Sequence, residues 1–129
     1  MTISELEDKL PNGFHDSYIV SVAMDFLAGT CRIELDVDYD DPDPDTLRRM
    51  KLQLKDVHLI ALGPQDPSSS FSPAGTVWVD GSATTEEIFP NLESYRKNAP
   101  QGTFFYSFFL RDANTYMHLA AKEALFEDV

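Results

Sequence analysis

The sequence is short of several residue types, and each shortage excludes a class of site or anchor. Its single cysteine, Cys31, excludes an internal disulfide and any metal site built from several cysteines. Ten Lys and Arg residues stand against 22 Asp and Glu residues, so the net charge of −12 argues against nucleic acid or an anionic membrane as a partner. No apolar run approaches the roughly 20 residues of a membrane span, and the first residues lack the basic and apolar regions of a signal peptide. We expect a cytoplasmic protein.

The remaining composition is that of a folded globular protein. Apolar residues make up 43% and aromatic residues 12% of the 129 residues, which is enough to form a core without disulfides or metals. The chain contains no internal repeat and no segment with the composition of a linker between domains. We therefore expect a single domain over residues 1–129.

The clearest structural signal is an alternation of apolar and charged residues over Cys31–Asp40. Its odd-numbered residues are apolar and its even-numbered residues are charged, which predicts a strand with one buried face and one charged face. The preceding segment, Tyr18–Phe26, is apolar at even positions, and we expect its even face to point inward. Leu27–Thr30 contains a glycine suited to a tight turn, so the two segments are predicted to form an antiparallel hairpin.

The rest of the chain predicts further strands and two helices. Thr2–Leu10 has the capping residues and apolar spacing of a short amphipathic helix. Leu47–Leu62 is predicted to be one long strand, with a β-bulge or a strand bend at Lys55–Asp56 where the apolar positions change from even to odd. The other predicted elements are a loop over 63–75, a strand over 76–80, a helix within 84–98, an aromatic strand over 103–110 and a final strand over 116–126.

These elements predict an α+β fold. We expect a curled or sandwich-like antiparallel sheet of about six strands, with a short N-terminal helix and one inserted helix.

The charged face of the predicted hairpin strand is the main candidate for function. It carries a carboxylate at every second position, Glu34, Asp36, Asp38 and Asp40. Like charges at this spacing repel one another, which is a reason to expect a role beyond folding. We predict that this face binds a basic protein, because complementary charge raises the association rate and selects partners. A solvated face without a partner, and a surface that imitates the charge of nucleic acid, are the alternatives.

The acidic run that continues from this strand does not match a calcium-binding EF-hand loop. Asp41 stands where that loop requires glycine, and Leu47 stands where it requires glutamate. A looser cation site stays open as an alternative, since hard cations need only clustered oxygen ligands. Its ligands would be Asp40, Asp41, Asp43 and Asp45.

The histidines give a hypothesis of a different class. His15 and Asp16 are adjacent, and a carboxylate beside an imidazole can serve acid–base chemistry. A small-ligand or enzymatic pocket in the curved sheet, using His15, Asp16 and His118, is therefore the alternative to a binding face. The simpler explanation is that the His15–Asp16 pair ties the strand entrance to the backbone. His58 and His118 are expected to face outward, and no histidine spacing is typical of zinc. We predict a non-enzymatic protein without metal or cofactor.

The order of these features resembles a loose group of small bacterial β-rich proteins, many of them uncharacterised and some similar to toxin-immunity proteins. The resemblance rests on the segments Gly13–Ser17, Cys31–Asp36, Leu52–Val57, Phe105–Leu110 and Tyr116–Lys122, which together cover about half of the chain. It implies a small β-rich fold that binds protein without catalysis or cofactor. The loop at 63–75 and the helix at 84–98 have no counterpart in that pattern.

Overall fold

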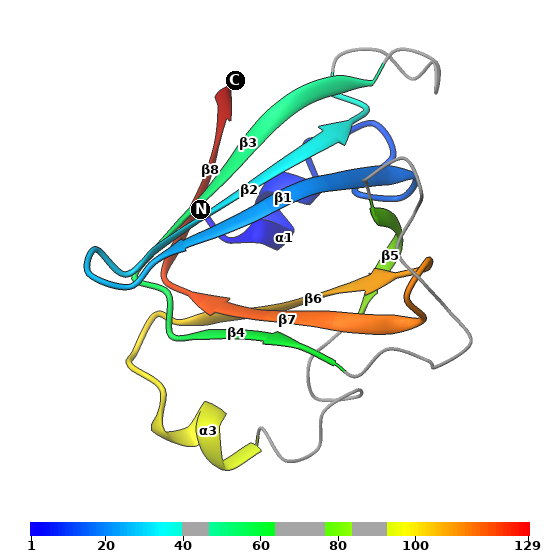
Figure 1. The fold of residues 1–129 in the computed structure, drawn as a ribbon. Helices are drawn as coiled ribbons and strands as arrows, with labels where there is room; N and C mark the ends of the chain where they lie inside the picture. The colour runs from blue at the N-terminus through cyan, green and yellow to red at the C-terminus, as the bar shows by residue number, and fades with distance from the viewer. Residues whose placement is uncertain (40–46, 64–76, 84–92) are drawn as a thin grey trace.

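The structure is a computed structural model in which residues 1–39, 47–63, 77–83 and 93–129 are described. Within these ranges the chain forms eight strands and two short helices (Figure 1). In chain order they are α1 (Ile3–Glu7), β1 (Ser17–Asp25), β2 (Thr30–Val37), β3 (Arg48–Lys55), β4 (Leu59–Leu62), β5 (Val77–Ala83), α3 (Glu93–Asn98), β6 (Phe104–Leu110), β7 (Thr115–Ala121) and β8 (Glu123–Asp128). Neither of these helices has the length and apolar character needed to cross a membrane.

The strands form one antiparallel sheet that bends into two facing layers. Their order is β4-β7-β6-β5-β1-β2-β3-β8. β5 joins the layers, because its residue Val79 pairs with Ser17 of β1 on one side and with Leu110 of β6 on the other. Figure 1 shows β8, β3, β2 and β1 on one side of the molecule and β6, β7 and β4 on the other. The two edges of the sheet are therefore β8 and β4.

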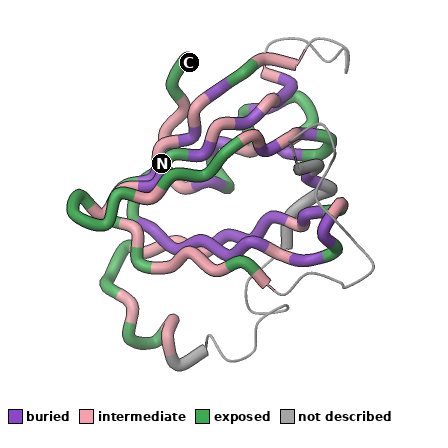
Figure 2. Tube along the Cα trace, in the orientation of Figure 1, coloured by how far each residue is buried: buried purple, intermediate pink, exposed green. Residues whose placement is uncertain are grey.

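The core lies between the two layers, and the buried segments in Figure 2 run along their facing sides. Alternation places every second side chain of each strand in the core, where removal of apolar surface from water stabilises the fold. The ring of Phe14 lies between the layers, with its centroid 5.1 Å from that of Phe108 in an edge-on contact. The core strand residues include Cys31, Ile33, Leu35, Val37, Met50, Leu52, Leu54, Tyr106, Phe108, Leu110, Met117 and Leu119.

The predicted N-terminal helix is present and shorter than expected. Thr2 caps it: the Thr2 hydroxyl accepts a hydrogen bond from the Glu5 N–H at 3.1 Å, and the Glu5 carboxylate accepts one from the Thr2 N–H at 2.7 Å. This capping box satisfies two backbone donors at the helix start. The Tyr106 hydroxyl donates a hydrogen bond to the carboxylate of Glu7. α1 is thereby tied to β6 and packs against β8 as well.

The predicted fold is confirmed as an antiparallel, sandwich-like sheet with few short helices. The number of strands is eight rather than about six. The excess arises because two segments that we expected to be single strands are each divided between the layers.

The first divided segment is the predicted strand Leu47–Leu62. β3 ends at Lys55, Asp56 has a φ of 52°, and β4 then pairs with β7 at the opposite edge of the sheet. The predicted irregularity at Lys55–Asp56 is present as a change of chain direction rather than a bulge, and the prediction of one continuous strand is wrong, because the chain leaves one layer there and enters the other. The second divided segment is the predicted strand 116–126, where the chain crosses back between β7 and β8 at Lys122.

The predicted inward face of β1 is correct for only part of the strand. Ser17 and Ile19 are buried, so odd residues face the core at the start of β1. The pairing with β2 then shifts between Ile19 and Ser21, and such a bulge reverses the facing of the residues that follow. Beyond it, Met24 packs against the core, whereas Phe26 lies in the turn and is 87% exposed. Gly29 has the positive φ, 68°, that the predicted turn requires.

Several predictions concern segments outside the described residues. They are the acidic segment 40–45, most of the loop 63–75 and the first part of the helix within 84–98. The described part of that helix is α3. The strand predicted over 76–80 corresponds to β5, and the aromatic strand over 103–110 to β6.

Candidate binding groove between α1 and β8

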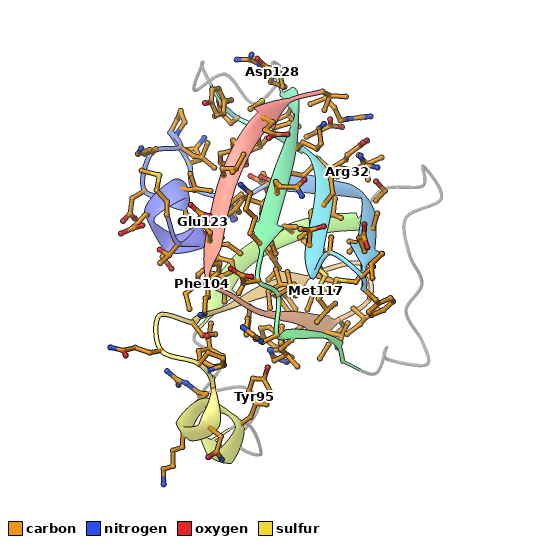
Figure 3. The ribbon with its side chains drawn as sticks, turned by 90° about the vertical axis from the view of Figure 1, so that its left-hand side faces the viewer. Arg32, Tyr95, Phe104, Met117, Glu123 and Asp128 are labelled. Atoms are coloured by element: carbon orange, nitrogen blue, oxygen red, sulfur yellow. The ribbon has the colours of Figure 1, made fainter. Side chains whose placement is uncertain are left out.

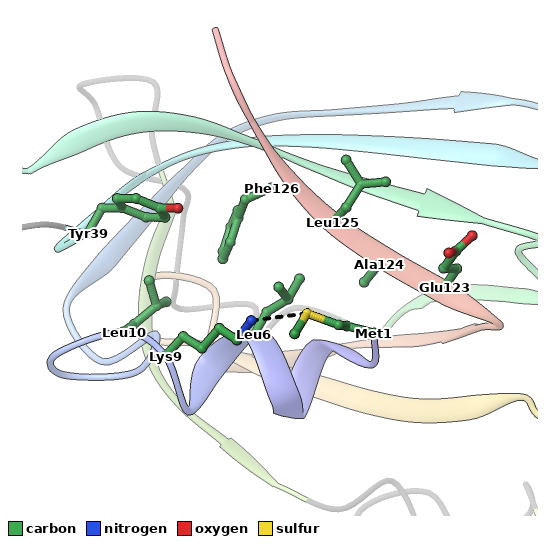
Figure 4. Close-up of a pocket in the computed structure, with 9 residues that line it drawn as sticks. All are labelled: Met1, Leu6, Lys9, Leu10, Tyr39, Glu123, Ala124, Leu125 and Phe126. Carbon is green, nitrogen blue, oxygen red and sulfur yellow. Dashed lines mark hydrogen bonds between the residues drawn. The ribbon is translucent and has the colours of Figure 1, made fainter.

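A groove of about 460 Å³ lies between α1 and β8 (Figure 4). α1 and the residues that follow it form one wall, and β8 forms the other. Most of the side chains drawn along it are apolar, with one lysine and one glutamate among them. The lining residues are Met1, Leu6, Lys9, Leu10, Tyr39, Glu123, Ala124, Leu125 and Phe126.

The helical wall follows from the spacing of apolar residues in the N-terminal segment. Ile3, Leu6 and Leu10 recur at intervals of three and four residues, and all three are buried. Ile3 belongs to the core, and Leu6 and Leu10 belong both to the core and to the groove lining. This wall is therefore held in place by the same contacts that hold the fold together.

Aromatic rings support the other wall. Phe126 of β8 lies edge-on to Tyr39, with ring centroids 5.9 Å apart and planes at 89°. The Phe126 ring is also 6.1 Å from that of Phe14 in the core. The guanidinium of Arg48 lies 5.1 Å from the centre of the Tyr39 ring, which is a cation–π contact. These contacts fix the orientation of the rings that line the groove.

β8 is an edge strand, and the described residues pair with only part of its outer backbone. The Ala124 N–H donates a hydrogen bond to the Met1 carbonyl at 2.7 Å, so the backbone of Ala124 points away from β3. Along a strand the backbone groups of alternate residues point to the same side, so those of Phe126 point the same way as those of Ala124. Within the described part of the chain, no backbone group is bonded to Phe126 on that side. The groove therefore borders an open strand edge.

Exposed carboxylates lie both in the N-terminal segment and on β8. Glu5 and Asp8 are exposed on and after α1, and Glu123, Glu127 and Asp128 are exposed on β8. Figure 3 labels Glu123 and Asp128 at the two ends of β8, with α1 beside the strand. All three β8 carboxylates have basic neighbours on β3: Asp128 forms an ion pair with Arg48, Glu127 lies 3.8 Å from Lys51, and Glu123 stands opposite Lys55. Lys9 is the one base that lines the groove.

The predicted acidic face of β2 is a mixed face of acids and bases. Asp36 lies opposite Arg49 of β3, and Glu34 lies opposite Lys51. The Arg49 guanidinium donates two hydrogen bonds to the Asp36 carboxylate, at 2.5 and 3.2 Å. Hydrogen bonding to Asp36 and the charge of that carboxylate raise the pKa of Arg49. The carboxylates of this strand are therefore paired across the sheet and do not form a purely acidic ladder.

Asp38, a third residue of the predicted acidic face, does not lie in it. Asp38 follows the end of β2 and is buried, contrary to the expectation of a solvent-facing side chain. Its Oδ2 accepts a hydrogen bond from the side-chain amide of Asn12 at 2.9 Å, because the chain turns inward there beneath the N-terminal segment. Asp40 lies outside the described residues, as do the other ligands of the alternative cation site.

The alternative pocket residues occupy different environments. His15 Nε2 lies 3.4 Å from Asp16 Oδ2, and both side chains are more than half exposed. The backbone N–H of Asp16 donates to the Val79 carbonyl at 3.1 Å, so this pair does mark the strand entrance. His118, on β7, is by contrast buried.

His118 was expected to face outward, and it is 2% exposed. β7 lies between β4 and β6 in the sheet, and side chains on both of its faces are buried. His118 Nδ1 lies 2.7 Å from the hydroxyl oxygen of Ser107 on β6. Desolvation lowers the pKa of His118.

Two further expectations concern metals and the cysteine. In the described part of the chain, no three His, Cys, Asp or Glu side chains are grouped in a way that could hold a metal ion. The three histidines therefore do not converge as a zinc site. Cys31 is buried on the apolar face of β2, as predicted, and burial raises the pKa of its thiol.

The groove itself was not predicted from the sequence. The sequence predicted one strand over 116–126, which includes the start of β8, and an amphipathic helix with Ile3, Leu6 and Leu10 on one side. The missed signal is the pattern of carboxylates at Glu123, Glu127 and Asp128 around the apolar residues Leu125 and Phe126, which is typical of an edge strand.

Comparison with known proteins gives one similar structure. No protein-family model and no curated protein matches the chain. Among solved structures, the chain is similar to an uncharacterized protein from Neisseria gonorrhoeae, with a TM-score of 0.46 and 9% sequence identity. That similarity covers 89% of this chain and 93% of the other.

Proposed function

We propose that the protein is a non-enzymatic protein-binding module, immunity-like in its mode of action, that holds a basic protein at the groove between α1 and β8. The observation that supports this proposal most is the open edge of β8 beside a preformed apolar groove. Apolar concavities with a few polar groups at the rim are typical binding sites. An unpaired strand edge adds hydrogen-bonding groups that a partner protein can use.

The charge distribution favours a basic partner at this place. Half of the ten bases of the chain lie on β2 and β3, namely Arg32, Arg48, Arg49, Lys51 and Lys55. There they compensate acids of that layer, and Lys55 and Lys51 lie opposite Glu123 and Glu127 of β8. The chain as a whole keeps a net charge of −12, and this excess of carboxylates would attract a positively charged surface and raise its rate of association.

The charged face that includes Glu34 and Asp36 is the second candidate surface for the same partner. Glu34 lies opposite Lys51, which in turn lies opposite Glu127 of β8. These cross-strand pairs continue from β2 to the edge strand, so a large partner at the groove would reach them.

The test is capture of a partner from a lysate of the source organism, at low and high salt, followed by affinity measurement with the purified partner. Glu123→Lys changes an exposed residue of the groove, and Glu34→Lys makes the same charge change on β2. We expect capture of a basic protein that is lost at high salt, and an affinity about five-fold weaker for Glu123→Lys. Thermal unfolding of both variants checks that they fold.

The two variants also separate the two surfaces. If only Glu34→Lys weakens the affinity for the partner, the binding site lies on the β2 face. Capture of no basic protein at low salt, or equal binding at both salt concentrations, would contradict the proposed function.

A further inference from the structure

We propose that the groove takes an extended segment of the partner, which pairs with β8 as an additional strand and carries lysine or arginine alternating with apolar residues. This inference rests on the proposed function and specifies its mode of binding.

The first argument is that one backbone N–H on the outer edge of β8, that of Ala124, already has a hydrogen-bond partner. The Met1 carbonyl accepts the Ala124 N–H at 2.7 Å, in the manner of a neighbouring strand. The next outward-facing backbone groups along β8 are those of Phe126, two residues further on, and they border the groove. An added strand at the usual spacing of about 4.8 Å from β8 would continue the pairing that Met1 begins.

The second argument is that the two faces of β8 differ in chemistry. Ala124 and Phe126 belong to the inner face and pack with the core. Glu123, Leu125 and Glu127 alternate with them and therefore lie on the outer face. A strand added to β8 would likewise place alternate side chains on these two faces. Its inner side chains would meet the apolar lining of the groove, and its outer side chains would meet two carboxylates.

The third argument identifies the charge of the occupant. Opposite charges in directly facing positions of neighbouring strands stabilise the pairing of the strands, and like charges there destabilise it. A second copy of the chain paired through β8 would bring Glu123 and Glu127 of the two copies near one another. A segment with lysine or arginine at its outer positions would instead form favourable pairs. The edge therefore fits a basic partner segment and disfavours self-association.

The experiment uses a six-residue peptide of alternating lysine and valine, matched in length to β8. The control peptide alternates glutamate and valine. Two further lysine–valine peptides are N-methylated at alternate amides, one on each edge of the strand, so each lacks the backbone donors of one edge. Binding is measured by calorimetry, and hydrogen exchange of the Phe126 amide is followed by NMR with and without the peptide.

We expect the lysine–valine peptide to bind and to slow exchange of the Phe126 amide, and the glutamate–valine peptide not to bind. One N-methylated isomer should bind about ten-fold more weakly than the other, because only one set of amides faces β8. Glu127→Lys should weaken binding several-fold, while Asp25→Lys, at the far edge of the hairpin, should not.

Two outcomes would overturn the inference. Equal affinities of the two N-methylated isomers, with an unprotected Phe126 amide, would show binding without strand addition. Failure of every peptide to bind, with a basic partner still captured in the lysate experiment, would remove strand addition while the proposed function stands. If no peptide binds and no basic partner is captured from the lysate, both strand addition and the proposed function are contradicted.

Discussion

His118 is buried inside the molecule, and its surroundings favour the neutral form of the ring. Its Nδ1 lies 2.7 Å from Ser107 Oγ, and its ring stacks on Tyr116 with a centroid distance of 6.2 Å. Burial removes water from the ring and disfavours the charged form, which lowers the pKa of His118. In the unfolded chain a histidine has a pKa of about 6.5. The unfolded state therefore binds a proton at a higher pH than the folded state does.

This difference in proton binding predicts that the unfolding free energy depends on pH through His118. The contribution of neutral His118 is fully present above the unfolded pKa and is lost as the pH falls below it, by up to about 1.4 kcal/mol per pH unit. We expect His118→Gln, which keeps a polar group beside Ser107, to reduce the slope of the unfolding free energy between about pH 6.5 and pH 5. Urea unfolding at several pH values measures it. An unchanged slope of the unfolding free energy with pH in His118→Gln would contradict the conclusion that burial lowers the pKa of His118.

At the scale of elements, the two places where the chain passes between layers lie side by side. The Lys122 N–H donates to the Lys55 carbonyl at 3.1 Å, and the His58 N–H donates to the Ala120 carbonyl at 2.8 Å. Each crossing thus supplies backbone partners for the other. Asp56 makes the first turn possible, because its φ of 52° lies in the left-handed region that aspartate tolerates better than most residues. This backbone conformation allows β3 and β4 to belong to different layers.

Substitution of Asp56 tests that role. Asp56→Ala should destabilise the protein by about 1 kcal/mol, because alanine adopts a positive φ less readily and cannot form local hydrogen bonds there. Asp56→Gly should be neutral or slightly stabilising, since glycine has no such restriction. Lys55→Ala, at the neighbouring exposed residue, is the matched control and should stay within about 0.5 kcal/mol. Equal losses for the alanine and glycine variants in urea unfolding would exclude the backbone explanation.

At the scale of the whole molecule, local patterns in the sequence predicted local structure, whereas the pairing of segments distant in the sequence is known only from the structure. The hairpin of β1 and β2 was predicted because its alternation and its glycine turn lie within 25 residues of one another in the printed sequence. The β3–β4 break was missed because the apolar pattern continues across Asp56. The groove was missed because it joins Leu6 to Leu125, which are brought together only by the placement of β8 at the sheet edge. Alternation likewise marked Glu34 and Asp36 as outward-facing, and only the register of β3 shows that they face Lys51 and Arg49.

The charge of the whole molecule leads to a last prediction, in which two electrostatic effects oppose each other. Salt weakens the cross-strand ion pairs, such as that of Asp36 and Arg49, and it also screens the repulsion that follows from a net charge of −12. The ion pairs are exposed and each contributes little, at most about 1 kcal/mol, whereas the repulsion acts among all the uncompensated carboxylates. The repulsion should therefore dominate.

We expect the unfolding free energy to rise by on the order of 1 kcal/mol between about 0.02 M and 0.5 M NaCl, which raises Tm by about 4 °C. Arg49→Gln removes one ion pair and one positive charge, so the increase with salt should be larger in this variant. A decrease of Tm with salt in the wild-type protein would show that the ion pairs of the β2–β3 face outweigh the repulsion.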